Sequence, residues 1–325
     1  MSRVAIISPG VQSLVQDLGR PGHGASGVPR GGAADALSLQ CGNVLLGNPA
    51  AAPAIEMAMI GAELAFDAAT RCCLAGAPNH ALLVDAGGSS RSVPRWTAFD
   101  VRPGERLVVK AIRPGLRAYL CVAGGVQVPA CLGSASTLLS CAMGGFRGRA
   151  LRAGDELDIG PAPAATAPPV ASAALAEWLE ATLRPGMLRV VATPDGEGAC
   201  RVALKALLDT PLVVSRRSDR VGVRLEPTPE FIAAIRGEAS GRTPSAGMTH
   251  GAIELTPGGE PIILGVDHPT TGGYPVVACV IAADLPALGQ LAPGDVVRLA
   301  RVDRDEARRA HAACRAMFAM ELRLP

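Results

Sequence analysis

The sequence predicts a mainly β protein with a few short helices, and two observations lead to this fold class. Short runs rich in Val, Leu and Ile, such as PIILGVD and VVACVIAAD, are separated by Gly/Pro turns at the spacing typical of barrels and sandwiches. A turn followed by an alternating strand also recurs, as RPGERLVVK, RAGDELDIG and APGDVVRLA. In each copy, Gly before an acidic residue suits a positive-φ turn position. Because the copies lie near the ends of both halves, we expect two related β-rich lobes.

A Pro/Ala tract at residues 161–171, PAPAATAPPVA, divides the chain, because it has neither charge nor periodicity. Ser172 is expected to cap a helix through SAALAEWLEATL, and a C-terminal helix is expected to begin near Asp303 with an Asp cap. We therefore predict an N-terminal β-rich lobe over residues 1–160, a linker and helix over 161–184, and a C-terminal β-barrel lobe with a C-terminal helix over 185–325.

Composition excludes several classes of function. The 325 residues carry a formal net charge of +2 and only 3% aromatic residues, which favours neither nucleic acid nor an anionic membrane as a partner. The N-terminus lacks a basic region followed by a sustained apolar stretch, and no uncharged apolar run is long enough to span a membrane, so we expect a cytoplasmic protein. The nine cysteines include no C-x-x-C pair, so we expect buried thiols and no metal site.

The segment DHPTTGGYP, residues 267–275, carries the densest group of reactive side chains. It follows the apolar strand PIILGV, so Asp267 and His268 should emerge where that strand ends. Asp267 could accept a substrate N–H or orient His268, which could then move protons near neutral pH. Thr270, Thr271 and Tyr274 could bind a carbonyl or a carboxylate. The alternative is that the Asp and both Thr only cap a turn.

The segment SRRSDRVGVRL, residues 215–225, contains three arginines: Arg216, Arg217 and Arg220. Alternation along a strand would send some of these guanidinium groups to one face, where they could bind carboxylate or phosphate. The alternative is a solvated basic strand edge that blocks pairing with other strands.

A third polar group lies in the first Gly-rich loop, where Gln16, Asp17 and Arg20 share a turn. Asp35 is expected to cap the helix that begins in ALSLQCGNVLLGN. Glu56 stands among apolar residues and needs a partner if it is buried, and an ion pair with Arg20 is one solution.

Two motif matches are set aside. GHGASG fits the G-x-G-x-x-G pattern, but prolines flank it and no strand-to-helix unit surrounds it, so we expect no dinucleotide site there. GGSS lacks the following glycines of an amidase serine loop, so we expect no nucleophilic serine.

These segments occur in an order that resembles the KipA family, also called allophanate hydrolase subunit 2 or the biotin-dependent carboxyltransferase family, which includes the C-type subunit of 5-oxoprolinase. The resemblance spans nearly the whole chain. Its motifs run through SPGVQSLVQDLGRPGHGASGVPRGGAADALSLQCGNVLLGN, YLCVAGGV, LGSAST, GGFRGR, SRRSDRVGVRL, GAIEL, PIILGVDHPTTGGYP and QLAPGDVVRL.

The resemblance implies cyclophilin-like β-barrel lobes and association with a KipI-like subunit. In the oxoprolinase version, these two subunits are taken to activate 5-oxoproline with ATP, with Mg expected beside it, and a LamB/YcsF-type protein helps to open the ring to glutamate. In urea carboxylase, a similar module accepts CO2 from biotin. This chain has no A-M-K-M biotinylation site, so we expect no covalent biotin on it.

Two positions depart from the family pattern. The family often has Gln two residues before the first Thr of T-T-G-G-Y, where this chain has His268, and Gln where Glu254 stands in GAIEL. Glu254 brings a possible charge to the presumed site, and this charge suits an amine or imide nitrogen better than a carboxylate.

The leading hypothesis is a subunit of an ATP-dependent 5-oxoprolinase that is active in a complex. The alternatives are a carboxyltransferase subunit of a biotin-dependent urea or amide carboxylase, and a regulatory module that binds a KipI-like partner. We expect catalytic roles for Asp267, His268 and Tyr274, and substrate-binding roles for Arg216, Arg220, Thr270, Thr271, Gly272, Gln16, Asp17, Arg20 and Glu254.

Overall fold

The computed structural model describes residues 2–163, 171–184, 186–236 and 244–321. The chain forms two compact units, which are Met1–Arg20, Gly31–Leu183 and Met317–Pro325 in the first, and Pro21–Arg30 and Arg184–Ala316 in the second. Most of the expected linker falls outside the described residues, and the helix that follows it belongs to the first unit.

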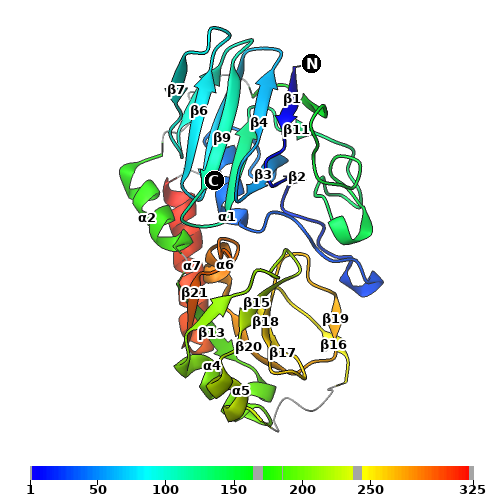
Figure 1. Ribbon diagram of the computed structural model, residues 1–325, viewed down its shortest axis with the longest axis vertical. Coiled ribbons are helices and arrows are strands. Elements are labelled where there is room, and N and C mark those ends of the chain that lie inside the picture. The colour runs from blue at the N-terminus through cyan, green and yellow to red at the C-terminus, as the bar shows by residue number, and fades with distance from the viewer. Residues whose placement is uncertain (1, 164–170, 185, 237–243, 322–325) are drawn as a thin grey trace. The chain divides into compact units, whose positions relative to one another are not determined.

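The first unit contains two antiparallel β-sheets (Figure 1). The seven-stranded sheet has the order β11-β12-β1-β4-β9-β6-β7, and the five-stranded sheet has the order β2-β3-β10-β5-β8. The strands are β1 (Arg3–Ser8), β2 (Gln12–Gln16), β3 (Ala54–Ala58), β4 (Glu63–Phe66), β5 (Thr70–Gly76), β6 (Asn79–Val84), β7 (Ser90–Ser92), β8 (Ala98–Val101), β9 (Arg106–Ile112), β10 (Arg117–Val122), β11 (Val126–Gln127) and β12 (Glu156–Ile159).

The two sheets share one hydrophobic core. Strand alternation decides which side chains enter it: in β9, Leu107 and Val109 are buried whereas Arg106 is exposed. Leu120 of β10, in the other sheet, belongs to the same buried cluster. The first unit is therefore a sandwich whose inner faces are lined by the aliphatic residues that dominate the composition.

Two helices of the first unit begin at caps that the sequence predicts. Asp35 accepts a 3.0 Å hydrogen bond from the backbone N–H three residues later, at the start of α1 (Ala36–Val44). Ser172 Oγ accepts a 2.9 Å bond from the first turn of α2 (Ala173–Leu183). Both predicted caps are confirmed, because each side chain satisfies a helix N–H that has no partner within the helix.

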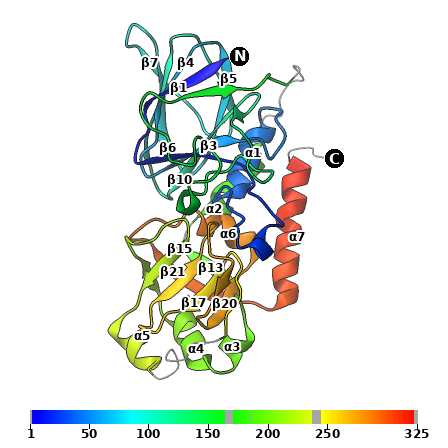
Figure 2. The ribbon, with the colours of Figure 1, turned by 90° about the vertical axis from the view of Figure 1, so that its right-hand side faces the viewer.

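The second unit is a closed barrel with the strand order β13-β20-β17-β18-β15-β14-β21 (Figure 2). All its pairs are antiparallel except β13 with β21, which closes the ring. Its strands are β13 (Met187–Ala192), β14 (Leu212–Val214), β15 (Gly222–Glu226), β17 (Ala252–Leu255), β18 (Pro261–Leu264), β20 (Val276–Val280) and β21 (Val296–Arg301). The prediction of a mainly β protein is confirmed.

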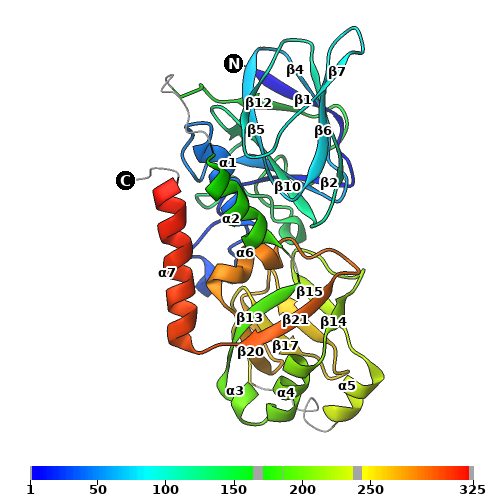
Figure 3. The same ribbon diagram turned by 90° about the vertical axis from the view of Figure 1, so that its left-hand side faces the viewer.

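Short elements surround this barrel. Helices α3, α4 and α5 gather at one end of it in both side views (Figures 2 and 3). A two-stranded ribbon pairs β16 with β19. The bounds are α3 (Pro194–Glu197), α4 (Arg201–Asp209), α5 (Pro229–Ala234), β16 (Ala246–Gly247), β19 (Thr271–Gly272), η3 (Ala282–Asp284), α6 (Leu285–Leu288) and α7 (Arg304–Glu321), with η1 (Gly24–Ser26) and η2 (Leu139–Cys141) earlier in the chain.

The C-terminal helix α7 begins as the sequence predicts. Asp303 Oδ1 accepts a 2.7 Å hydrogen bond from the backbone N–H of Glu306, so Asp303 is the cap. Ala307 and Ala310, in the first turns of the helix, pack against a small apolar cluster that contains Val302. The helix is therefore held by its apolar side at its beginning, as expected for an amphipathic surface helix.

The three repeated turns share one hydrogen-bonding device. The glycine of each has a φ of 81°, 86° or 92°. The acidic residue after it accepts a hydrogen bond from the backbone N–H three residues earlier, at 2.7 Å for Glu105, 2.7 Å for Asp155 and 2.8 Å for Asp295. The sequence predicted the turns and their glycines, whereas the acidic residue turns out to close each turn.

Replacing Asp155 tests this device. Asp155 also pairs with Arg149 through bonds of 2.7 and 2.8 Å. We expect Asp155→Ala to lower the free energy of unfolding by about 1–3 kcal/mol, because the Arg152 N–H and the guanidinium lose their acceptor. Both tryptophans lie in the first unit, so their fluorescence during urea denaturation reports on it. Asp158→Ala, at an exposed position of the same strand region, is the control. Equal midpoints for the two variants would contradict the assignment.

Candidate functional site

The loop between β14 and β15 carries the three arginines of the SRRSDR segment. Residues 215–221 precede β15, so strand alternation does not position them as the sequence pattern predicted. Arg217 pairs with Glu260, and this carboxylate also accepts a 2.8 Å bond from Arg224. Arg216 is exposed and has no hydrogen-bond or ion-pair partner among the described residues. Arg216 is therefore available to an anion.

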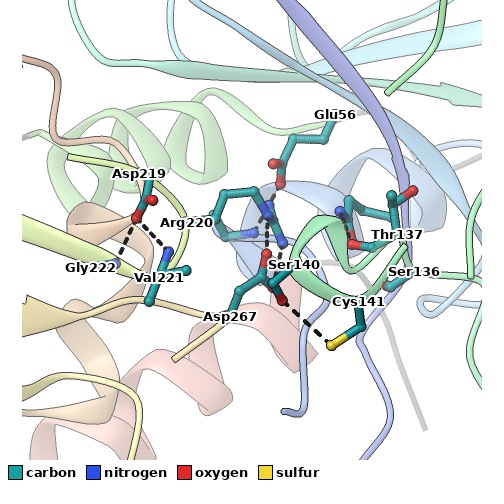
Figure 4. Close-up of polar contacts among 12 residues, drawn as sticks. Glu56, Ser136, Thr137, Ser140, Cys141, Asp219, Arg220, Val221, Gly222 and Asp267 are labelled. Carbon is teal, nitrogen blue, oxygen red and sulfur yellow. Dashed lines mark hydrogen bonds and ion pairs between the residues drawn. The ribbon is translucent and has the colours of Figure 1, made fainter. Parts of the chain in front are cut away.

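Arg220 and Asp267 form a buried ion pair (Figure 4). The guanidinium donates from Nε to Oδ2 at 2.7 Å and from one terminal nitrogen to Oδ1 at 3.1 Å. The backbone N–H of Asp267 also donates to the Arg220 carbonyl at 3.0 Å. Because both side chains are about 95% buried, the pair depends on this two-pronged geometry. It joins the arginine loop to the start of DHPTTGGYP.

The same loop is also braced locally. Asp219 Oδ1 accepts hydrogen bonds from the backbone N–H groups of Val221 and Gly222, at 2.8 and 3.1 Å (Figure 4). The carboxylate thus closes a turn just before β15 begins. Arg220 is consequently held by its backbone as well as by its ion pair.

His268 is oriented by a backbone carbonyl. Its Nδ1 lies 2.8 Å from the carbonyl oxygen of Pro269, and a carbonyl can only accept, so Nδ1 carries the proton. In the neutral ring Nε2 is then a hydrogen-bond acceptor. The expected orientation of His268 by Asp267 is wrong, because the Asp267 carboxylate is turned to Arg220 instead.

His250 is a member of this site that the sequence patterns did not reveal. Its burial and the nearby charges of His268, Arg30 and Arg220 lower the pKa of His250 to about 4. Arg30 comes from the segment Pro21–Arg30, which belongs to the second unit. No local pattern could have joined these residues, because they are brought together only by the fold.

The remaining residues of DHPTTGGYP line the small ribbon. Thr271 and Gly272 form β19, and the backbone N–H of Met248 donates to the Thr270 carbonyl at 3.0 Å. Tyr274 is 37% exposed, and Thr271 is exposed as well. Their hydroxyl groups therefore remain open to a ligand.

Glu254 lies beneath this ribbon. It is 6% exposed, and its Oε1 is buried without a hydrogen-bond partner. Burial raises the pKa of this carboxyl. A Cβ atom added at Gly272 would lie 2.6 Å from Oε1, so only glycine leaves room there for the carboxyl.

In the first unit, Asp17 joins the first Gly-rich loop to the LGSAST loop. Its carboxylate accepts hydrogen bonds from Ser134 Oγ at 2.6 Å, Ser136 Oγ at 2.5 Å, the Ala135 N–H at 2.7 Å and the Gly19 N–H at 2.7 Å. Four donors occupy both oxygens. Asp17 is thus placed to hold two loops that are more than a hundred residues apart in the sequence.

Gln16 and Arg20 are anchored to the same loop. Gln16 Nε2 donates to the Thr137 carbonyl at 3.0 Å, and one terminal nitrogen of Arg20 donates to the Ser136 carbonyl at 2.5 Å. Gln16 Oε1 and the other terminal nitrogen of Arg20 are buried without partners. Each side chain therefore keeps one unused hydrogen-bonding atom.

The expected ion pair between Glu56 and Arg20 is wrong. Glu56 accepts hydrogen bonds from the Ala34 N–H at 2.9 Å and from the Tyr119 hydroxyl at 2.8 Å, and it lies 3.6 Å from the guanidinium of Arg117. Tyr119 and Arg117 stand on β10, directly beside β3, which carries Glu56. Strand pairing supplied partners that lie far away in the sequence.

Two searches of the described ranges bear on other kinds of site. In these ranges no three His, Cys, Asp or Glu side chains come together as a metal site would require. No helix in this part of the chain has the length and apolar character needed to cross a bilayer.

The low pKa of His250 makes stability depend on pH. Its folded pKa of about 4 lies below the ordinary value of 6.5, so the unfolded chain takes up a proton first as pH falls. We expect stability from this source to be present above pH 6.5 and to be lost as pH falls toward about 4. His250→Gln should remove that part of the pH dependence of urea denaturation. Identical pH profiles for the two proteins would refute the assignment.

Comparisons with known proteins agree on one family. A family model described as carboxyltransferase domain, subdomain A and B, matches residues 26–301. The C-type 5-oxoprolinase subunit of Escherichia coli K12 is 33% identical over 307 residues, which cover 94% of this chain and 93% of the relative. The Haemophilus influenzae protein of the same name is also 33% identical, over 91% of this chain and 90% of the relative.

Urea-processing proteins match over part of their length. Urea amidolyase of Saccharomyces cerevisiae is 30% identical over 94% of this chain but only 17% of its own. The crystal structure of the Kluyveromyces lactis urea carboxylase superposes with a TM-score of 0.85 at 28% identity, over 97% of this chain and 29% of that chain. This chain thus corresponds to nearly the whole of the bacterial subunits and to one segment of these larger proteins.

Proposed function

Because this chain belongs to the carboxyltransferase domain family, subdomains A and B, we propose that it is a subunit of an ATP-dependent 5-oxoprolinase. In the proposed complex it acts with a KipI-like and a LamB/YcsF-like subunit to open 5-oxoproline to glutamate. The observation that carries this proposal is the 33% identity to the E. coli protein over 93% of that protein. The urea-processing relatives match over much smaller shares of their length.

The second unit offers groups that suit this substrate. 5-Oxoproline carries a carboxylate and a cyclic amide, and Arg216 is an exposed guanidinium with no partner in the described part of the chain. We assign the carboxylate to Arg216. His268 presents Nε2 as an acceptor and can hold a proton during ring opening, while Thr270 and Thr271 can donate to the amide carbonyl.

Arg220 and Asp267 take a positioning role in this proposal. Their bidentate pair occupies the groups that the sequence patterns had assigned to the substrate. The pair fixes the loop that carries Arg216 and the loop that carries His268. Asp267 therefore acts through the geometry of its neighbours, and Tyr274 remains the exposed hydroxyl at the far end of the segment.

ATP with Mg²⁺ is proposed as a co-substrate of the complex, where it would supply the phosphoryl group that activates the amide carbonyl. The described residues of this chain hold no cluster of carboxylate, His or Cys ligands for a metal, so no step through ATP is assigned to them. We propose that the nucleotide is bound with the partner subunits.

A second candidate is a carboxyltransferase subunit that receives CO2 from a biotin carrier on another protein. The TM-score of 0.85 to the urea carboxylase structure, over 97% of this chain, favours it. Activity that requires bicarbonate and is blocked by avidin would select this function. Stable binding of a KipI-like partner without turnover in any mixture would select the regulatory alternative.

Reconstitution tests the proposal directly. The chain is mixed with its KipI-like and LamB/YcsF-like partners, ATP and 5-oxoproline, and both ATP consumption and glutamate release are measured. We expect glutamate to form only in the complete mixture and to disappear when this chain is omitted. Glutamate release at the same rate without this chain would overturn the proposal.

Arg216→Ala tests the carboxylate site. We expect KM for 5-oxoproline to rise about tenfold or more with a smaller change in kcat, since a charge-assisted hydrogen bond contributes about 1.5–3 kcal/mol. Arg298→Ala is the matched control, because Arg298 is an exposed arginine of the same unit on β21. An unchanged KM in Arg216→Ala, or an equal change in the control, would exclude the role.

A further inference from the structure

Glu254 occupies an unusual position on the barrel wall. Its neighbours on β17, Ile253 and Leu255, belong to the barrel core, so strand alternation places Glu254 on the outer face. The register of β17 with β20 shifts between Ile253 and Glu254. Such a bulge re-aims the side chain that follows it, and bulges are common beside active sites.

The surroundings of Glu254 are apolar. Across the strands it faces Ile262 of β18 and Val276 of β20. The ribbon covers it: Gly272 lies against its Oε1, and Met248 lies beside Gly272. The four residues of the two ribbon strands are uncharged. Arg224, on the outer side of β15 beyond Ile262, is paired with Glu260 instead.

Neither oxygen of Glu254 has a hydrogen-bond partner among the described residues. A carboxylate removed from water without a donor is costly, and other buried carboxylates of this chain, such as those of Asp17 and Asp267, have donors. The raised pKa of the Glu254 carboxyl has burial as its cause, with no neighbouring charge contributing. Glu254 is thus a carboxyl that lacks a donor beside the loop that carries the proposed catalytic residues.

We propose that Glu254 recognises an N–H group of the small-molecule substrate by accepting its hydrogen bond. In terms of the proposed function, on which this identification of the ligand rests, the donor is the ring N–H of 5-oxoproline. The ligand supplies the donor that the protein withholds, and Gly272 keeps the approach to the carboxyl open. The contact selects substrates with a free amide N–H over those in which this nitrogen carries carbon.

The prediction is a proton released on binding. Accepting an N–H stabilises the carboxylate form, so a ligand should displace the proton that burial favours. Binding to the reconstituted complex without ATP is measured by isothermal titration calorimetry at about pH 5.5, above the ordinary Glu pKa of about 4.3. Two buffers of different ionisation enthalpy reveal the proton count. The ligands are 5-oxoproline and its N-methyl derivative.

We expect wild-type complex to release protons with 5-oxoproline and to bind the N-methyl derivative about tenfold or more weakly. Glu254→Gln retains an amide oxygen that accepts the N–H, so it should bind 5-oxoproline within about threefold of wild type with the proton release abolished. Glu254→Leu and Gly272→Ala should each weaken binding about tenfold or more, because one removes the acceptor and the other blocks it.

The inference and the proposed function can fail separately. Turnover of 5-oxoproline with equal proton release in wild type and Glu254→Gln, or with no preference over the N-methyl derivative, would overturn the role of Glu254 and leave the function standing. Binding of urea with Glu254-dependent proton release, in a complex that never forms glutamate, would keep the N–H recognition and reject the substrate. Absence of binding by every N–H ligand tested would reject both.

Discussion

Carboxylates that leave water need hydrogen-bond donors, and this constraint shapes both units of the protein. Asp17 collects four donors from two loops, and Glu56 collects a backbone N–H, a phenol and a nearby guanidinium. Asp267 takes a bidentate guanidinium. Each of these carboxylates joins chain segments that the sequence holds far apart. The loops that carry polar residues are consequently held in place by buried charge as well as by the strands that they connect.

The sequence was sufficient wherever a short segment decides its own structure. Ser172, Asp35 and Asp303 cap helices, because a side-chain oxygen three residues before a free N–H is a local arrangement. The Gly-acid turns are equally local, and alternating apolar residues identified the strands that follow them. These patterns required no knowledge of which strands pair.

Pairing between distant segments was the limit of such reasoning. Arg20 was the expected partner of Glu56, but β10 places Arg117 and Tyr119 beside it. In the second unit, the arginine segment was expected to be a strand, and it is a loop whose Arg220 turns to Asp267. His250 shows the same limit, since its neighbours come from three other parts of the chain. The register of the strands, which local sequence encodes weakly, decides all three cases.

Glu254 gains its meaning from being the exception to this rule. The fold supplies donors to Asp17, Glu56 and Asp267, yet it buries Glu254 between an apolar strand pair and a ribbon without one. Gly272 leaves the carboxyl room, and the bulge in β17 points it away from the barrel core. A site that costs stability in the free protein is one where a ligand can recover that cost on binding. The residues with satisfied charges therefore form the frame, and the unsatisfied ones, Glu254 and Arg216, are the groups left for the substrate.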